Sequence, residues 1–160
     1  MFGGVRLSIF YTDGSAHPNP GPGGFGVLEI IDNKPFFAYS KQCENTTNNR
    51  EELKGILWIM LTCGVHKNSR KIAPIVYSDS AYSINTLTNW MFNWEKNNWL
   101  KSNNQPPENL DLIKAYYDHY KKGYRIQLEK VKGHSGNKWN DIVDKLATGK
   151  ITSEEVLKND

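Results

Sequence analysis

The segment Leu7-Ser8-Ile9-Phe10-Tyr11-Thr12-Asp13-Gly14-Ser15 combines a strand pattern with an acidic residue at the point where the strand should end. Residues 7–12 alternate in a largely apolar, period-two pattern, which predicts a buried or half-buried strand. Open α/β sheets usually place their sites at the carboxyl ends of strands. Asp13 is therefore a candidate site residue, although Asp-Gly is also a common turn dipeptide.

A second segment repeats this arrangement further along the chain. Residues 72–78 form an apolar run, and Asp79 follows between two serines. Pro74 lies early in the run, where a strand tolerates proline. If the two strands are parallel neighbours, the carboxylates of Asp13 and Asp79 emerge at the same edge of the sheet.

The rest of the chain alternates between strand and helix patterns. We expect further strands at 27–31, 36–42 and 124–131, and helices at 53–63, 79–87, 108–122 and 137–148. Asn48 with Glu51, or Asn49 with Glu52, has the spacing of a capping box at the start of the first helix. The order of elements predicts an α/β fold. It has a mixed five-stranded sheet, with an antiparallel ribbon of three strands and two parallel strands, and helices on both faces.

Composition indicates one ordinary globular domain. The chain has 160 residues, 38% hydrophobic and 23% charged, with a net charge of +3. We expect a single domain at 1–148 and a C-terminal tail at 149–160 with room for a short helix. No apolar run approaches the ~20 residues of a membrane span. The N-terminal segment lacks the apolar stretch of a signal peptide, so we expect a cytoplasmic protein.

Two other patterns carry little chemistry. Gly21 to Gly26 matches G-x-G-x-x-G, but a dinucleotide site requires that motif to open a helix, and a strand pattern follows here. Cys43 and Cys63 match no metal-ligand spacing and are expected to be free thiols. The mild basicity permits a polyanionic partner without establishing one.

Turns and helix caps could explain each acidic residue singly, but they do not explain the placement of the acidic residues together. On the last helix an apolar stripe faces the core, which leaves Asp144 on the other side, and Glu51 or Glu52 lies at the start of the first helix. Clustered carboxylates repel one another unless a cation is present, and oxygen ligands suit Mg²⁺ or Mn²⁺. Singly, each acid could instead solvate a surface or cap a helix.

Five motifs together resemble type 1 ribonuclease H. They are TDGS (12–15), NPGPGG (19–24), TTNNREEL (46–53), SDS (78–80) and KGHSGNKWNDIVDKLA (132–147). Their order and spacing match that family over nearly the whole chain. The resemblance implies a ribonuclease H fold with strand order 3-2-1-4-5 and hydrolysis of the RNA strand of RNA/DNA hybrids.

The resemblance also implies which residues act. The four metal-binding acids match Asp13, Glu52, Asp79 and Asp144, and the histidine of a flexible loop matches His134. Glu52 is carried over, and Glu51 is not, because the family's acid directly precedes the helix leucine. The implied mechanism uses two Mg²⁺ ions, with Mn²⁺ as a substitute, and leaves 5′-phosphate and 3′-hydroxyl ends. His134 would move protons or release product, unless it is only a structural loop residue.

Substrate contacts follow from the same resemblance. Asn19, Asn48 and Asn49 match residues that line the minor groove, Thr47 and Asn109 match part of a pocket for a DNA phosphate, and Tyr82 and Trp90 match aromatic residues along the DNA strand. Trp94 and Trp99 match a projecting handle, where packing between its helices is the favoured interpretation. We expect a monomer without an obligate protein partner.

Three positions depart from the family pattern. Asn45 replaces a frequent arginine of the phosphate pocket, Ala81 replaces a frequent glutamine, and Glu95 offsets Lys96 and Lys101 in the handle. Fewer phosphate contacts predict a shallow salt dependence of hybrid binding. Two alternatives stay open: another ribonuclease H-like or reverse-transcriptase-derived nuclease, and a non-catalytic hybrid-binding module.

Overall fold

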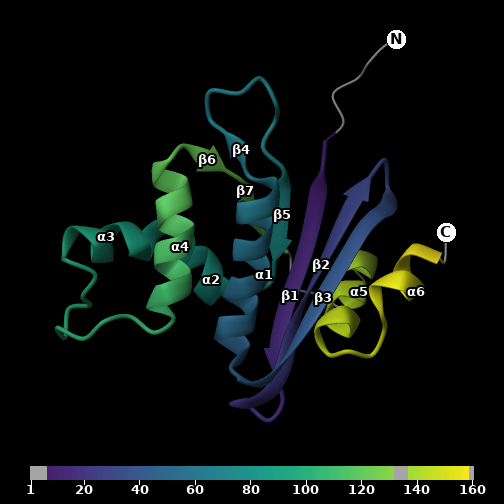
Figure 1. Ribbon diagram of the computed structural model, residues 1–160, viewed down its shortest axis with the longest axis horizontal. Helices are drawn as coiled ribbons and strands as arrows, with labels where there is room; N and C mark the ends of the chain where they lie inside the picture. Colours follow the sequence, from purple (N-terminus) through teal and green to yellow (C-terminus); the bar gives the residue numbers. More distant parts are fainter. Residues whose placement is uncertain (1–6, 132–136, 159–160) are drawn as a thin grey trace.

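The computed structural model describes residues 7–131 and 137–158 (Figure 1). Its strands are β1 (Ile9–Ala16), β2 (Gly21–Ile31), β3 (Lys34–Thr46), β4 (Val65–His66), β5 (Ile75–Ser78), β6 (Tyr124–Arg125) and β7 (Gln127–Lys130). Its helices are α1 (Asn48–Cys63), α2 (Ala81–Asn85), a π-helical turn at Thr86–Trp90, α3 (Met91–Lys96), α4 (Leu110–Lys121), α5 (Lys138–Ala147) and α6 (Ser153–Lys158). None of the helices in these residues is long and apolar enough to span a bilayer.

The five long strands form one mixed sheet in the order β3-β2-β1-β5-β7. β1 pairs antiparallel with β2, and β2 with β3, whereas β5 runs parallel to both β1 and β7. This confirms the expected fold and the expected order of the long strands. β4 and β6 form a separate two-stranded ribbon, of which β4 was not predicted and β6 lies at the start of the strand expected at 124–131.

Helices cover both faces of the sheet, as Figure 1 shows, with α1 on one side and α5 on the other. Because side chains alternate along a strand, β1 contributes Phe10 to the core beneath α1 and Tyr11 to the core beneath α5. Ile59 of α1 and Val143 of α5 are both completely buried against these two layers. The largely apolar character of residues 7–12 thus reflects a strand with both faces covered.

Several expected boundaries are wrong for identifiable reasons. β2 starts at Gly21, six residues earlier than expected, because the glycines that read as a turn pair with β1 and β3. The expected strand at 124–131 divides at Ile126 into β6 and β7. The helix expected at 79–87 starts at Ala81, with Ser80 as its N-cap, and helical structure continues to Lys96.

The C-terminal segment packs on the same body. α6 brings Val156 into the core layer that also contains Leu28, Ala38 and Val143. Figure 1 shows α6 next to α5, beside the β2–β3 edge of the sheet.

Candidate active site

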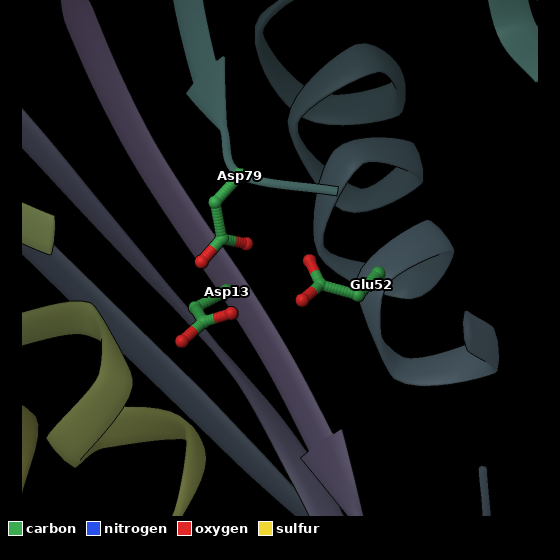
Figure 2. Close-up of side chains that lie close together, drawn as sticks. All are labelled: Asp13, Glu52 and Asp79. Atoms are coloured by element: carbon green, nitrogen blue, oxygen red, sulfur yellow. The ribbon is translucent and has the colours of Figure 1, made fainter. Parts of the chain in front are cut away.

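Three carboxylates converge between the inner strands β1 and β5 and helix α1 (Figure 2). Asp13 comes from β1, Glu52 from the first turns of α1, and Asp79 from the residue that follows β5. One oxygen from each carboxylate lies within 4.8 Å of the others. Asp13 and Glu52 are 6% and 8% exposed, whereas Asp79 is exposed to solvent. The acidic cluster is therefore buried at Asp13 and Glu52 and open to solvent at Asp79.

Strand register brings Asp13 and Asp79 together. β1 and β5 pair Ile9 with Ile75 and Tyr11 with Tyr77, and the same register continued by two residues sets Asp13 opposite Asp79. Asp79 follows the end of β5, as its pattern predicts. The expectation that the first strand ends at Asp13 is wrong, because β1 continues to Ala16 in its pairing with β2.

Gly14 brings Glu52 to Asp13. A β-carbon built on Gly14 would overlap the peptide bond between Glu51 and Glu52. Without a side chain at this position, the first turn of α1 rests directly on β1. Gly14 therefore allows the backbone of α1 to approach the strand that carries Asp13.

Gly26 allows an equally close approach of α5 on the other face of the sheet. It pairs with Asp13 across β1 and β2, and a β-carbon there would lie 2.6 Å from Cβ of Leu146 and 2.9 Å from the carbonyl oxygen of Val143. α5 is therefore seated close to the strand that carries Asp13. Asp144, the residue between these two contacts, is exposed, and its charge reaches both Asp13 and Asp79. It is not among the three carboxylates within 4.8 Å of one another.

Crowding and burial perturb these acids in one direction. Burial, together with the nearby charges of Asp79 and Asp144, raises the pKa of Asp13 to about 7, although hydrogen bonding with Glu52 and with the Gly14 amide at 2.9 Å acts to lower it. Burial, then the charge of Asp13, raises the pKa of Glu52 well above its usual range. Partial burial and the charge of Asp144 also raise the pKa of Asp79. Without a cation, this cluster retains protons near neutral pH.

The cluster fits a hard divalent cation. All its ligand atoms are carboxylate oxygens, the type that Mg²⁺ and Mn²⁺ prefer. Glu52 Oε2 is buried and has no hydrogen-bond partner within residues 7–131 and 137–158. A buried carboxylate oxygen without a partner is costly, and a bound cation would satisfy it.

Glu51 points elsewhere, although it is completely buried. Its Oε2 accepts a hydrogen bond from Thr46 Oγ1 at 2.6 Å and forms an ion pair with Lys54 Nζ at 2.8 Å. The geometry thus brings Glu52 to Asp13 and ties Glu51 to the end of β3. The capping box expected at Asn48 or Asn49 is wrong, because Thr47 is the N-cap and its Oγ1 accepts from the Arg50 amide at 3.1 Å.

Two of the three asparagines expected at the minor groove are linked beside the acids. Asn48 Oδ1 accepts from the Ala16 amide at 2.7 Å, and the Asn48 amide donates to Asn19 Oδ1 at 3.1 Å. Since backbone amides can only donate, both side-chain oxygens are occupied and both Nδ2 groups are left as donors. Asn49 is exposed one residue further along α1.

A second group of expected contacts surrounds a residue that the sequence did not single out. Asn109 Nδ2 donates to the Tyr82 hydroxyl at 3.2 Å, and Asn109 Oδ1 lies 3.4 Å from Arg50 Nη1. Thr47 is tied to the same residue through the Arg50 amide. Arg50 immediately follows Asn48 and Asn49 in the sequence, and this position is the feature that could have marked it as a candidate substrate contact.

The projecting segment is held together by aromatic contacts. Trp90 is 38% exposed and lies tilted against Trp94, with ring centroids 6.2 Å apart. Trp99 meets the ring of Tyr117 edge-on at 5.2 Å, and Glu95 accepts from the Tyr117 hydroxyl at 3.1 Å. Trp99 therefore packs against α4, Trp94 packs with it against the same buried cluster, and Trp90 keeps an open face. Asn45 and Ala81 are both exposed, and His134 lies outside the described residues.

Comparisons with known proteins agree with this geometry. The chain matches the RNase H family over residues 6–152. It is 40% identical over 154 residues to the ribonuclease H of Thermoanaerobacter sp. (strain X514), and the match covers 94% of each chain.

Two solved structures share the fold at lower identity. LC9-RNase H1, a type 1 RNase H with the type 2 active-site motif, superposes with a TM-score of 0.72 at 23% identity over 98% of this chain and 76% of that one. A foamy viral protease-reverse transcriptase in complex with RNA/DNA hybrid gives 0.73 at 17% identity over 89% of this chain and 20% of that one. The matches over nearly the full sequence decide the assignment: this chain belongs to the type 1 ribonuclease H family of metal-dependent, hydrolytic endoribonucleases.

Proposed function

We propose that this protein hydrolyses the RNA strand of RNA/DNA hybrids with two Mg²⁺ ions, or Mn²⁺ in their place, and leaves 5′-phosphate and 3′-hydroxyl ends. The observation that carries the proposal is the convergence of Asp13, Glu52 and Asp79 within 4.8 Å in a chain of this family. The hybrid bound to the viral protein that shares this fold supports the choice of substrate.

Asp13, Glu52 and Asp79 would hold the cations, with Asp144 of α5 as the fourth acid. When bound, such ions activate water and stabilise the leaving oxygen of a phosphoryl transfer. The protein supplies rigid placement, since Gly14 and Gly26 fix α1 and α5 against β1 and β2. Cation binding to a cluster that holds protons near neutral pH releases them, so affinity for the metal should rise with pH.

Glu52 has a second role in the proposal. Its carboxylate lies on the α1 side of the cluster and is 8% exposed. As the family resemblance implies, it would contact the ribose 2′-hydroxyl near the scissile phosphate, the group that distinguishes RNA from DNA. His134 would move a proton or help product leave, as the family resemblance implies.

Asn19 and Asn48 would read the minor groove as donors. Each side-chain oxygen is already occupied by a backbone amide, so each Nδ2 faces acceptors, such as purine N3, pyrimidine O2 or a ribose oxygen. Asn49 extends this line, Thr47 and Asn109 would hold a phosphate of the DNA strand, and Tyr82 and Trp90 would pack on deoxyribose. A cytoplasmic, monomeric enzyme without an obligate protein partner, in which 1–148 forms one domain, stays a prediction.

One assay tests the proposal against the alternative of a non-catalytic hybrid-binding module. The protein is incubated with end-labelled RNA/DNA hybrid, duplex RNA or duplex DNA, in Mg²⁺ or in EDTA. We expect cleavage of the RNA strand of the hybrid, in Mg²⁺ alone, with 5′-phosphate product ends. Hybrid binding without Mg²⁺-dependent cleavage would contradict the proposal and favour the binding module.

A further inference from the structure

Arg50 is held by an exposed acidic residue at the start of α4. Its Nη1 and Nη2 donate to the two carboxylate oxygens of Asp111 at 3.0 and 2.7 Å. The two side chains are 33% and 62% exposed. This is the two-point geometry in which guanidinium binds carboxylate and phosphate alike. A phosphate could therefore take the place of the Asp111 carboxylate without any change in the shape of the guanidinium.

The surroundings of Arg50 favour that exchange. Thr47, Tyr82 and Asn109, the residues proposed to meet the DNA strand, form a hydrogen-bonded group around it. The Thr47 hydroxyl oxygen accepts from the Arg50 amide, so its hydrogen stays available to donate to an anion. The guanidinium also keeps donors that no described partner uses, since only Nη1 and Nη2 are engaged.

The ion pair between Arg50 and Asp111 is expected to add little to the stability of the fold. Ion pairs between exposed side chains contribute little to folding and are screened by salt. Asp111 instead places a negative charge where a polyanionic backbone would pass, which opposes binding. The pair therefore has a larger expected effect on substrate binding than on the fold.

We propose that Arg50 is a further substrate-binding residue that grips a backbone phosphate of the DNA strand, and that Asp111 is an intramolecular substitute for that phosphate which weakens binding. This inference rests on the proposed function and deepens it. In the free protein Asp111 occupies the guanidinium, and on hybrid binding Arg50 exchanges the carboxylate for a phosphate oxygen. Because binding must first break this contact, the apparent affinity equals the intrinsic affinity multiplied by the fraction of molecules in which Arg50 is free.

The experiment measures hybrid affinity against salt concentration, in an Asp13→Asn background that prevents cleavage. Asp111→Asn should bind about two- to fivefold more tightly, the range expected for release of a surface ion pair. Arg50→Gln should bind more weakly, and its salt slope should fall by about 0.9, the loss of one phosphate contact. Asp118→Asn is the matched control, because it removes the same charge two turns further along α4 and is exposed.

Two further measurements separate a direct contact from a general charge effect. In an Arg50→Gln background, Asp111→Asn should add nothing, since its gain passes through the guanidinium. A DNA strand with single neutral methylphosphonates should lose affinity at one position for Asp111→Asn, and that loss should vanish with Arg50→Gln. A matching loss on the RNA strand would contradict the assignment to DNA.

The inference is overturned if Asp111→Asn binds no more tightly than Asp118→Asn, or if its gain persists without Arg50. This failure differs from failure of the proposed function. A wild-type protein that cleaves hybrid in Mg²⁺ while Asp111→Asn gains nothing overturns the role of Arg50 and Asp111 alone. A wild-type protein that cleaves no hybrid overturns both.

Discussion

Gly14 lies so close to the first turn of α1 that a β-carbon there would overlap the backbone nitrogen of Glu52. The colliding atoms belong to the backbone, so no side-chain rotation can relieve the overlap. We expect Gly14→Ala to displace α1 from β1 and to lower the free energy of unfolding by about 1–3 kcal/mol. Cleavage should fall far more than stability does, because Glu52 moves with the helix.

The check on Gly14→Ala is a comparison of thermal unfolding in EDTA with hybrid cleavage in Mg²⁺. Ser15→Ala is the control, since it makes a small change at the next residue of the same strand. A Gly14→Ala protein with wild-type cleavage would show that Glu52 does not depend on this contact.

Asp13→Asn should abolish cleavage without weakening the metal-free fold. The substitution removes a cation ligand and, at the same time, a buried charge that two other acids oppose. We expect turnover to fall by on the order of 10³-fold or more, and the melting temperature in EDTA to stay equal or rise. Asp141→Asn, on an exposed turn of α5, should change neither quantity. A clearly lower melting temperature for Asp13→Asn would mean that Asp13 is structural.

The stability of the metal-free protein should fall as pH rises through the acidic range. The pKa of Asp13 is raised from 3.8 to about 7, so between these values the folded state holds a proton that the unfolded state has lost. The free energy of unfolding therefore decreases with rising pH across this window, by at most about 4 kcal/mol for this group. Thermal melts in EDTA from pH 4 to pH 8 measure the trend. Asp13→Asn should make the decrease shallower, with the raised pKa values of Glu52 and Asp79 accounting for what remains, and Mg²⁺ should also make it shallower. A rising trend in EDTA would contradict the assignment.

The sheet and its two acids could be predicted because their signals are local. Alternation in residues 7–12 and the acid after each of two apolar runs need no knowledge of distant residues. β2 was expected to start too late, because the glycines at 21, 23 and 24 read as a turn although each pairs with a neighbouring strand. Their small size serves contact between strands and helices, which no local pattern reveals.

The role of Arg50 could not be predicted for a related reason. Its partners Asn109 and Asp111 lie 59 and 61 residues away in the sequence. Only the packing of α4 against α1 brings them together. Glu51 and Glu52 were equally good candidates for a cation ligand from their positions in the sequence alone. The family resemblance selected Glu52, and the geometry agrees, since Glu52 lies with Asp13 and Asp79.

Asn48 offers a test of polarity at the minor groove. Its Oδ1 accepts from the Ala16 amide at 2.7 Å, a contact that the carboxylate of Asn48→Asp would preserve. The substitution removes the outward-facing donor and adds a charge that repels the phosphates. We expect hybrid affinity to fall by about tenfold or more, since a lost donor leaves a substrate acceptor without its partner. The melting temperature should change little, because the bond to Ala16 survives.

Asn33→Asp makes the same chemical change at the exposed β2–β3 turn and should leave affinity within about twofold. Fluorescence anisotropy with a labelled hybrid, in an Asp13→Asn background, measures both variants. Equal affinities for Asn48→Asp and Asn33→Asp would show that Asn48 does not donate to the substrate.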